Sequence, residues 1–188
     1  KVEDYGDYLF LVAHFFSYDA ASMTLSSDQV SMVIGSGFVL TFQERPTGNF
    51  NPIRERIRQD RAQMRLQGAD YLAYCLLDAV VDRYFSVLEA IGERAEELEE
   101  LLLDKANRHV LENLHHLKRA ALTLRRAVWP LREVINALTR EHAFFKPETQ
   151  PYLRDIYDHT VHVIESLEAI RDLIAGLLDI YLSTVSNR

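Results

Sequence analysis

The C-terminal stretch YLRDIYDHTVHVIESLEAIRDLIAGLLDIYLSTVSNR, residues 152–188, decides the fold that we predict for this chain. Apolar residues recur in it at spacings of three and four, which is the period of one face of an α-helix. They are Leu153, Tyr157, Val161, Ile164, Leu167, Ile170, Ile174, Leu177 and Tyr181. Pro147 and Pro151 bracket the start, and no glycine or proline ends the pattern before Arg188. We therefore expect one long helix that packs its apolar face and continues past the last residue.

A second face of the same helix is acidic. Its carboxylates recur every seven residues, at Asp158, Glu165, Asp172 and Asp179. Small residues stand between or beyond them, at Ala169, Gly176, Ser183 and Ser186. Parallel copies of such a helix around an axis would turn each acid into a ring of carboxylates and form a corridor for cations. The solvated face of an amphipathic helix has the same spacing, and spacing alone favours that simpler interpretation.

A possible metal site lies at the start of this face. Asp155, Asp158, His159 and His162 stand at positions i, i+3, i+4 and i+7, so they share one side of a helix. Magnesium would prefer the carboxylates and keep several waters, whereas cobalt or zinc would accept the imidazoles. A hydrated polar face is the alternative, and for an isolated cluster it is the more common one.

Upstream of residue 146 the sequence predicts a small antiparallel sheet and then long helices. Strands are expected at 5–18, 29–34 and 38–43, with a hairpin at Gly35-Ser36-Gly37. Helices are expected at 52–66, 70–104 and 108–140, the last one kinked at Pro130. The predicted parts are three strands and a helix over 1–66, two long antiparallel helices over 67–145, and a stalk helix over 146–188. The fold class is α+β.

Composition excludes several classes of function. The 188 residues carry a net charge of −7, which argues against nucleic acid as a partner. Cys75 is the single cysteine, so a disulfide framework and a thiolate metal site are excluded. No run of about 18 apolar residues is present, so we expect this stretch of chain to be soluble. The sequence has no nucleophile–base motif and no glycine-rich phosphate loop, so we expect no enzyme.

Several motifs resemble those of the CorA-type magnesium/cobalt transporters. They lie in the order found in that family and span most of the chain: IRERI at 53–57, ADYL at 69–72, LDA at 77–79, WPLRE at 129–133, YLRDIYDHT at 152–160 and GLLDIYLS at 176–183. The resemblance implies a homopentamer with a cytoplasmic funnel. Each subunit would contain an α/β/α domain, two long antiparallel helices and a stalk helix that leads to the membrane.

The resemblance also assigns roles to residues. Asp155 matches the aspartate that binds a regulatory divalent cation between subunits, with partner carboxylates that precede Lys1 in the family. Asp78 matches a residue of a second, adjacent cation site. Asp158 and His159 match motif positions beside them.

At the other end of the last helix, Asp179 matches an acidic ring at the pore mouth, and Leu182 and Ser186 match residues that line the path beyond it. The implied cations are Mg²⁺, both sensed and transported, and Co²⁺. The implied location is the cell inner membrane, with this part on the cytoplasmic side and the membrane segments after Arg188. The alternatives are a zinc transporter of the same superfamily and a helical scaffold or adaptor without transport.

Overall fold

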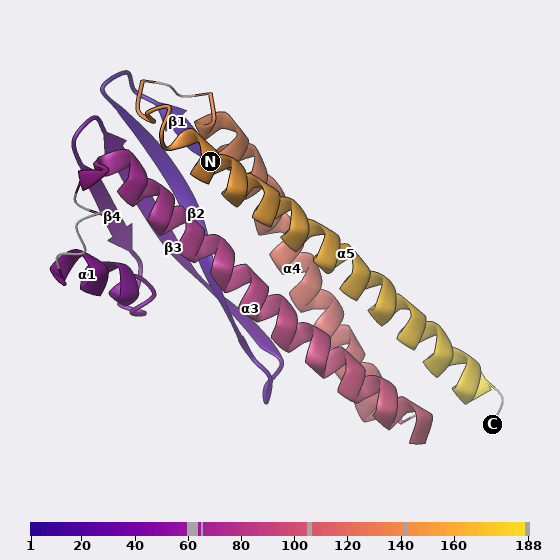
Figure 1. Cartoon of the computed structure of the whole chain (residues 1–188). Coiled ribbons are helices and arrows are strands. Elements are labelled where there is room, and N and C mark those ends of the chain that lie inside the picture. The colour runs from indigo at the N-terminus through magenta and orange to yellow at the C-terminus, as the bar shows by residue number, and fades with distance from the viewer. Residues whose placement is uncertain (60–63, 65, 105–106, 141–142, 187–188) are drawn as a thin grey trace.

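The computed structural model describes residues 1–59, 64, 66–104, 107–140 and 143–186. Figure 1 shows a twisted antiparallel sheet lying along a bundle of long helices. The strands are β1 (Val2–Asp4), β2 (Tyr8–Asp19), β3 (Thr24–Gly35) and β4 (Val39–Gln43), and they lie in the order β1-β2-β3-β4. The α+β class is therefore confirmed. The sheet has four strands instead of the expected three, because residues 2–4 pair with β2.

The predicted hairpin between β3 and β4 is present. The Gly35 amide donates to the Phe38 carbonyl at 2.9 Å. A Cβ atom on Gly35 would lie 2.3 Å from the Phe38 ring, so a larger residue here would have to displace that exposed side chain. β3 begins at Thr24 rather than at the expected residue 29, since the polar segment before Gln29 continues the pairing with β2.

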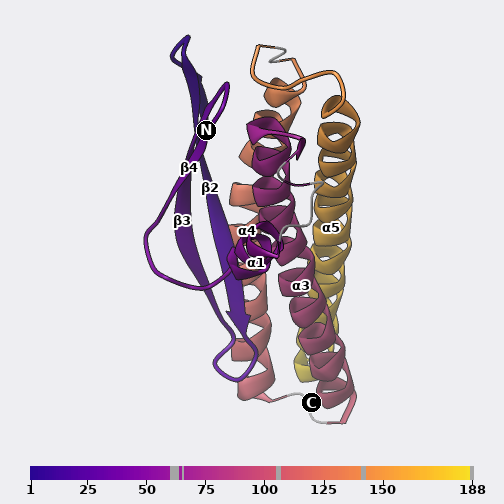
Figure 2. The same ribbon diagram turned by 60° about the vertical axis from the view of Figure 1, so that its left-hand side comes forward.

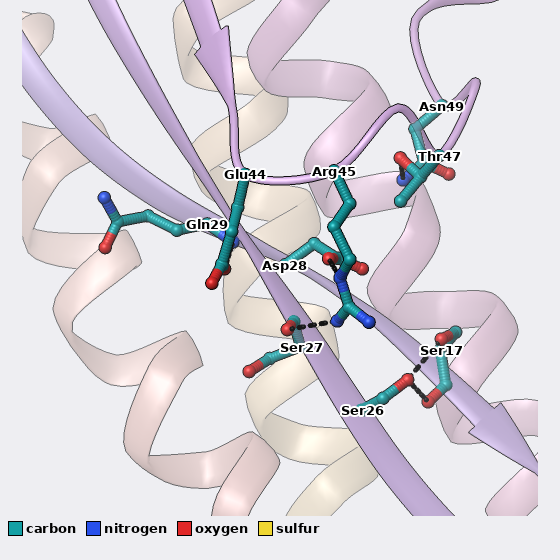
Figure 3. A network of polar contacts seen from close by, with 9 residues as sticks. All are labelled: Ser17, Ser26, Ser27, Asp28, Gln29, Glu44, Arg45, Thr47 and Asn49. Carbon is teal, nitrogen blue, oxygen red and sulfur yellow. Dashed lines mark hydrogen bonds and ion pairs between the residues drawn. The ribbon is translucent and has the colours of Figure 1, made fainter.

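Polar contacts hold that polar segment in the sheet (Figure 3). Ser17 and Ser26 lie opposite each other on β2 and β3, and their hydroxyls are 2.7 Å apart. Arg45, just after β4, pairs with Asp28 and donates to the Ser27 carbonyl. These contacts add to the packing of Leu25 and Tyr18 against the core. Because the segment itself is mostly polar, alternation of apolar residues does not reveal the strand.

Four helices follow in the described residues: α1 (Asn51–Arg58), α3 (Ala69–Asp104), α4 (Arg108–Leu138) and α5 (Gln150–Ser186). The three long ones confirm the predicted helices to within two residues at most ends. α1 ends at Arg58, and much of the stretch to residue 66 that was predicted to continue it lies outside the described residues. α4 runs through Pro130 without interruption, and its first turn is capped by Asn107, whose side chain accepts from the Val110 amide at 3.0 Å.

The core lies where the sheet meets α3 and α4, and where those two helices meet α5 (Figure 2). Leu9, Leu11 and Met32 of the sheet are fully buried, as is Leu77 of α3. On α5 the predicted apolar face is turned inward, with Leu153, Leu167, Ile174 and Leu177 nearly or fully buried. The outer face of the sheet is different: Leu40 is 50% exposed and Phe42 is 60% exposed. The described helices thus cover one face of the sheet and supply two layers of the expected α/β/α arrangement.

Candidate cation site and the exposed face of the last helix

The first turns of α3 and α5 lie against each other. The Asp70 carboxylate accepts a hydrogen bond from the Thr149 hydroxyl at 2.7 Å and another from the Lys146 amide at 3.1 Å. Next to this contact, the Tyr152 ring packs against the rings of Tyr71 and Tyr74, with centroids 5.2 and 5.0 Å away. These contacts hold the two helices together at the end where the predicted cation ligands lie.

Asp78 of α3 and His159 of α5 meet two turns further along. The Asp78 Oδ1 and His159 Nδ1 atoms are 4.0 Å apart, and the Asp78 side chain is 30% exposed. The His159 ring stands edge-on to Phe85 at 6.3 Å, which fixes the side of α5 on which the imidazole lies. The structure therefore brings Asp78, which the resemblance assigned to a second cation site, next to His159, which matches a motif position of the family.

The electrostatics around Asp78 favour an added cation. Burial raises the pKa of Asp78, and the neighbouring carboxylates Asp82 and Asp155 raise it further, while His159 and Arg56 act in the opposite direction. Ionised Asp78 is therefore held at a cost in free energy that a divalent ion would relieve. Burial and the charges of Asp78 and Asp155 also raise the pKa of Tyr74, which places that hydroxyl in the same acidic surroundings.

A cleft of about 450 Å³ opens on the other side of Asp78, between α1 and α3. Its charged lining residues are Arg56, Asp78, Asp82 and Arg83. Cys75 also borders it and is a buried free cysteine, as expected from its apolar surroundings, and burial raises the pKa of its thiol. Arg56 lowers the pKa of Asp78, whereas Asp82, which borders the same cleft, raises it.

The cluster predicted from spacing on α5 divides in two. His159 is directed to Asp78, whereas His162 pairs with Glu165 at 3.1 Å. Asp155 and Asp158 are exposed. No group of three His, Cys, Asp or Glu side chains in the described residues is close enough to hold a metal ion. Of the predicted ligands, Asp78 and His159 are therefore the pair that the structure brings together, and Asp155 is near enough to raise the pKa of Asp78.

The acidic face of α5 is exposed along its length. Every position of the predicted stripe from Asp155 to Ser186 is solvent-accessible, including Asp179. Asp172 pairs with Arg171 at 3.1 Å, while Asp158 and Asp179 make no ion pair within the part of the chain that the structure describes. Leu182, one turn before the end of α5, is 59% exposed. The chain leaves this face unpacked, which both interpretations of the stripe require.

Two residues of this region were not predicted from the sequence. Thr149 holds the start of α5 to Asp70, and Asp82 adds charge beside Asp78. Asp82 stands one helical turn after Asp78, so the i, i+4 spacing of two acids on α3 was an available signal. Thr149 had no such signal, because its partner lies on another helix.

The family model described as "CorA-like Mg2+ transporter protein" matches residues 1–188. The chain belongs to the CorA family. A relative from Thermotoga maritima, "Cobalt/magnesium transport protein CorA", is 44% identical over 189 residues, which cover all of this chain and 54% of that protein. This CorA-family chain therefore spans about half the length of that relative.

Solved structures share the fold. The soluble domain of CorA from Methanocaldococcus jannaschii superposes with a TM-score of 0.85 at 20% identity, over 97% of this chain and 73% of that one. The ZntB cytoplasmic domain from Vibrio parahaemolyticus gives 0.78 at 12% identity, over 99% and 72%. Among the described residues of this CorA-family chain, no helix has the length and apolar character needed to cross a bilayer.

Proposed function

We propose that the chain is the cation-sensing cytoplasmic part of a CorA-type transporter of Mg²⁺, and also of Co²⁺. Membership of the CorA family supports this, as does 44% identity to a protein named for cobalt and magnesium transport. The observation that carries the sensing role is the position of Asp78, half-buried beside Asp82 and Asp155 and 4.0 Å from His159.

The sensing mechanism follows from charge. Without a cation, Asp78 and its neighbouring carboxylates repel one another. Mg²⁺ at this position relieves the repulsion, and exposed Asp155 is available to a carboxylate of a neighbouring subunit. A cation that binds between subunits favours the state in which they are close, and loss of the cation shifts the population to the state in which they separate. High cytoplasmic Mg²⁺ thus keeps the transporter closed, and low Mg²⁺ opens it.

The acidic face of α5 belongs to the ion path in this proposal. In a homopentamer with α5 nearest the axis, Asp158, Glu165, Asp172 and Asp179 form successive rings that attract cations. Asp179 is the ring at the pore mouth, and Leu182 and Ser186 line the path beyond it. The protein resides in the inner membrane, with this part on the cytoplasmic side and α5 leading to the membrane segments.

The test uses the full-length protein and its protection from protease by Mg²⁺. Asp155→Ala should abolish most of the protection, because the shared cation loses its ligand between subunits. Glu133→Ala is the matched control, since Glu133 is an exposed acid on α4 that pairs with its neighbour Arg132 at 2.6 Å. If Asp155→Ala and the control both retain full protection, the sensor role is wrong.

Zinc is the second candidate cargo, since the ZntB domain shares the fold. That likeness, at 12% identity, concerns the fold alone, whereas the identity to the Thermotoga protein extends along the whole chain. Uptake of Mg²⁺, Co²⁺ and Zn²⁺ by vesicles containing the full-length protein distinguishes them: we expect the first two to enter. Zinc uptake alone would contradict the magnesium assignment.

A further inference from the structure

A buried polar contact joins the beginnings of α3 and α5, far from each other in the sequence. Asp70 and Thr149 are each 3% exposed, and the Thr149 hydroxyl donates to Asp70 Oδ2 at 2.7 Å. The same oxygen accepts from the Lys146 amide at 3.1 Å. A buried carboxylate is retained only where hydrogen bonds compensate its desolvation, so this contact is costly to break.

We propose that the Asp70–Thr149 contact is a positioning lock that sets the register of α5 against α3, and so the approach of Asp155 and His159 to Asp78. The inference rests on the proposed sensing function. Asp70 lies two helical turns before Asp78 on α3, and Thr149 immediately precedes α5. A displacement at the lock therefore moves Asp155 and His159 relative to Asp78, because a helix transmits it as a rigid element.

The turn before α5 is itself rigid, which makes the lock effective. The Thr149 amide donates to the Lys146 carbonyl at 3.0 Å, and the Leu153 amide donates to the Thr149 carbonyl at 3.2 Å. Asp70 thus holds both ends of one hydrogen-bonded turn, at the Lys146 amide and at the Thr149 hydroxyl. The N-termini of α3 and α5 both meet at this carboxylate, and their dipoles favour its negative charge.

The packing around the lock leaves little room for an alternative register. Gly68 has φ +93°, and a Cβ there would lie 3.2 Å from Asp70 Oδ1, so the chain before α3 passes close to the carboxylate. Tyr71, Tyr74 and Tyr152 pack together on the next turn. The tyrosine rings are apolar contacts that tolerate sliding, whereas the hydrogen bonds to Asp70 specify one position.

The test compares Thr149→Val, which is nearly isosteric but lacks the hydroxyl, with Thr149→Ser, which retains it. In the full-length protein, Thr149→Val should raise the Mg²⁺ concentration for half-maximal protease protection about fivefold or more. Thr149→Ser should leave that concentration at the wild-type value. Asp70→Asn should act in the same direction as Thr149→Val. Leu114→Ala is the stability control, because Leu114 is fully buried in the second turn of α4 and contacts neither Asp70 nor Thr149 through any hydrogen bond. It should lower the melting temperature and leave the Mg²⁺ midpoint unchanged.

A second measurement does not depend on metal. In chelator, amide hydrogen exchange over residues 146–159 should be faster in Thr149→Val than in wild type, and also faster than in Leu114→Ala, which keeps the hydrogen bond to Asp70. A Thr149→Val protein with wild-type exchange and a wild-type Mg²⁺ midpoint would overturn the lock. If the sensing function is wrong, Asp155→Ala will leave the protease protection by Mg²⁺ unchanged. Hydrogen exchange in Thr149→Val still tests the lock in that case.

Discussion

Asp78 is a residue whose surroundings disfavour its ionised form. It is a half-buried carboxylate with two further acids nearby, and both burial and those acids raise its pKa. In a folded chain without metal, the ionised form is therefore disfavoured relative to the unfolded chain. Such conflicts are characteristic of functional sites, where the structure retains a charge that a ligand will use.

Asp78→Asn should raise the stability of the metal-free protein at pH 7. The amide keeps the shape of the side chain and removes the charge that burial penalises. We expect a gain of no more than about 1 kcal/mol, or about 2–4 °C in melting temperature for a chain of this size. Thermal unfolding in chelator measures it. Addition of Mg²⁺ should stabilise the wild type more than the variant.

The pH dependence of the stability difference between wild type and Asp78→Asn tests the same assignment in a second way. Because the folded-state pKa of Asp78 is raised, the folded wild type holds more protons than the unfolded chain once the pH exceeds the ordinary Asp value of about 4. Wild-type stability from this group is therefore lost as pH rises through the folded pKa. The advantage of Asp78→Asn should be largest at pH 7 and should vanish below about pH 4. An advantage that grows on acidification would contradict the assignment.

At the scale of an element, α5 combines a buried face that fixes it with an exposed face that the chain does not use for packing. Gly176 lies on the exposed face, and a Cβ built there has nothing within 4 Å. The chain alone thus gives no steric reason for glycine at this position. In the proposed assembly the reason would be the width of the ion path.

Gly176→Ala should stabilise the isolated chain, because glycine inside a helix costs about 0.5–1 kcal/mol relative to alanine. Thermal or denaturant unfolding at low protein concentration measures the gain. The reverse substitution at the neighbouring exposed position, Ala175→Gly, is the matched control and should lose a similar amount. A loss of stability in Gly176→Ala would mean that this face is already packed against another copy.

Prediction from the sequence succeeded where one element contains the whole signal. The periodicity of residues 152–188 specified α5, its buried face and its exposed face, because each depends on spacing within a single helix. The approach of His159 to Asp78 was not predicted, because it depends on the register between two helices. The contact of Asp70 with Thr149, 79 residues apart, could not be predicted from either residue alone. The start of β3 was missed because serine hydroxyls and backbone pairing, rather than apolar alternation, hold it.

At the scale of the whole molecule, the described sheet is covered by helices on one face only. Leu40 and Phe42 of β4 stand on the other face with half or more of their surface exposed. Exposed apolar groups on an edge strand favour association with other chains. The inner face of the same sheet carries the stabilising contacts, including the Tyr84 hydroxyl of α3, which donates to the His14 carbonyl at 2.8 Å.

The double variant Leu40→Thr, Phe42→Thr should therefore leave the fold of this chain intact and reduce its self-association. We expect a change in melting temperature of about 2 °C or less, and lower light scattering at high concentration. The control is Leu9→Thr, whose side chain is fully buried on the inner face, and which should destabilise the chain by about 2 kcal/mol or more. Strong destabilisation by the double variant would show that the outer face is packed in solution.

Because α5 is long, a small tilt at its first turns produces a large displacement at its last turn. At about 1.5 Å per residue, Ser186 lies about 46 Å along the helix axis from Asp155. A tilt of about 2° at Asp155 therefore displaces Ser186 by about 1.6 Å, more than the radius of a water molecule. The candidate cation ligands lie at the first turns of α5, where such a tilt would originate. In the proposed homopentamer, a change in coordination too small to disturb the core would thus be enough to widen or narrow the ring of Ser186 side chains.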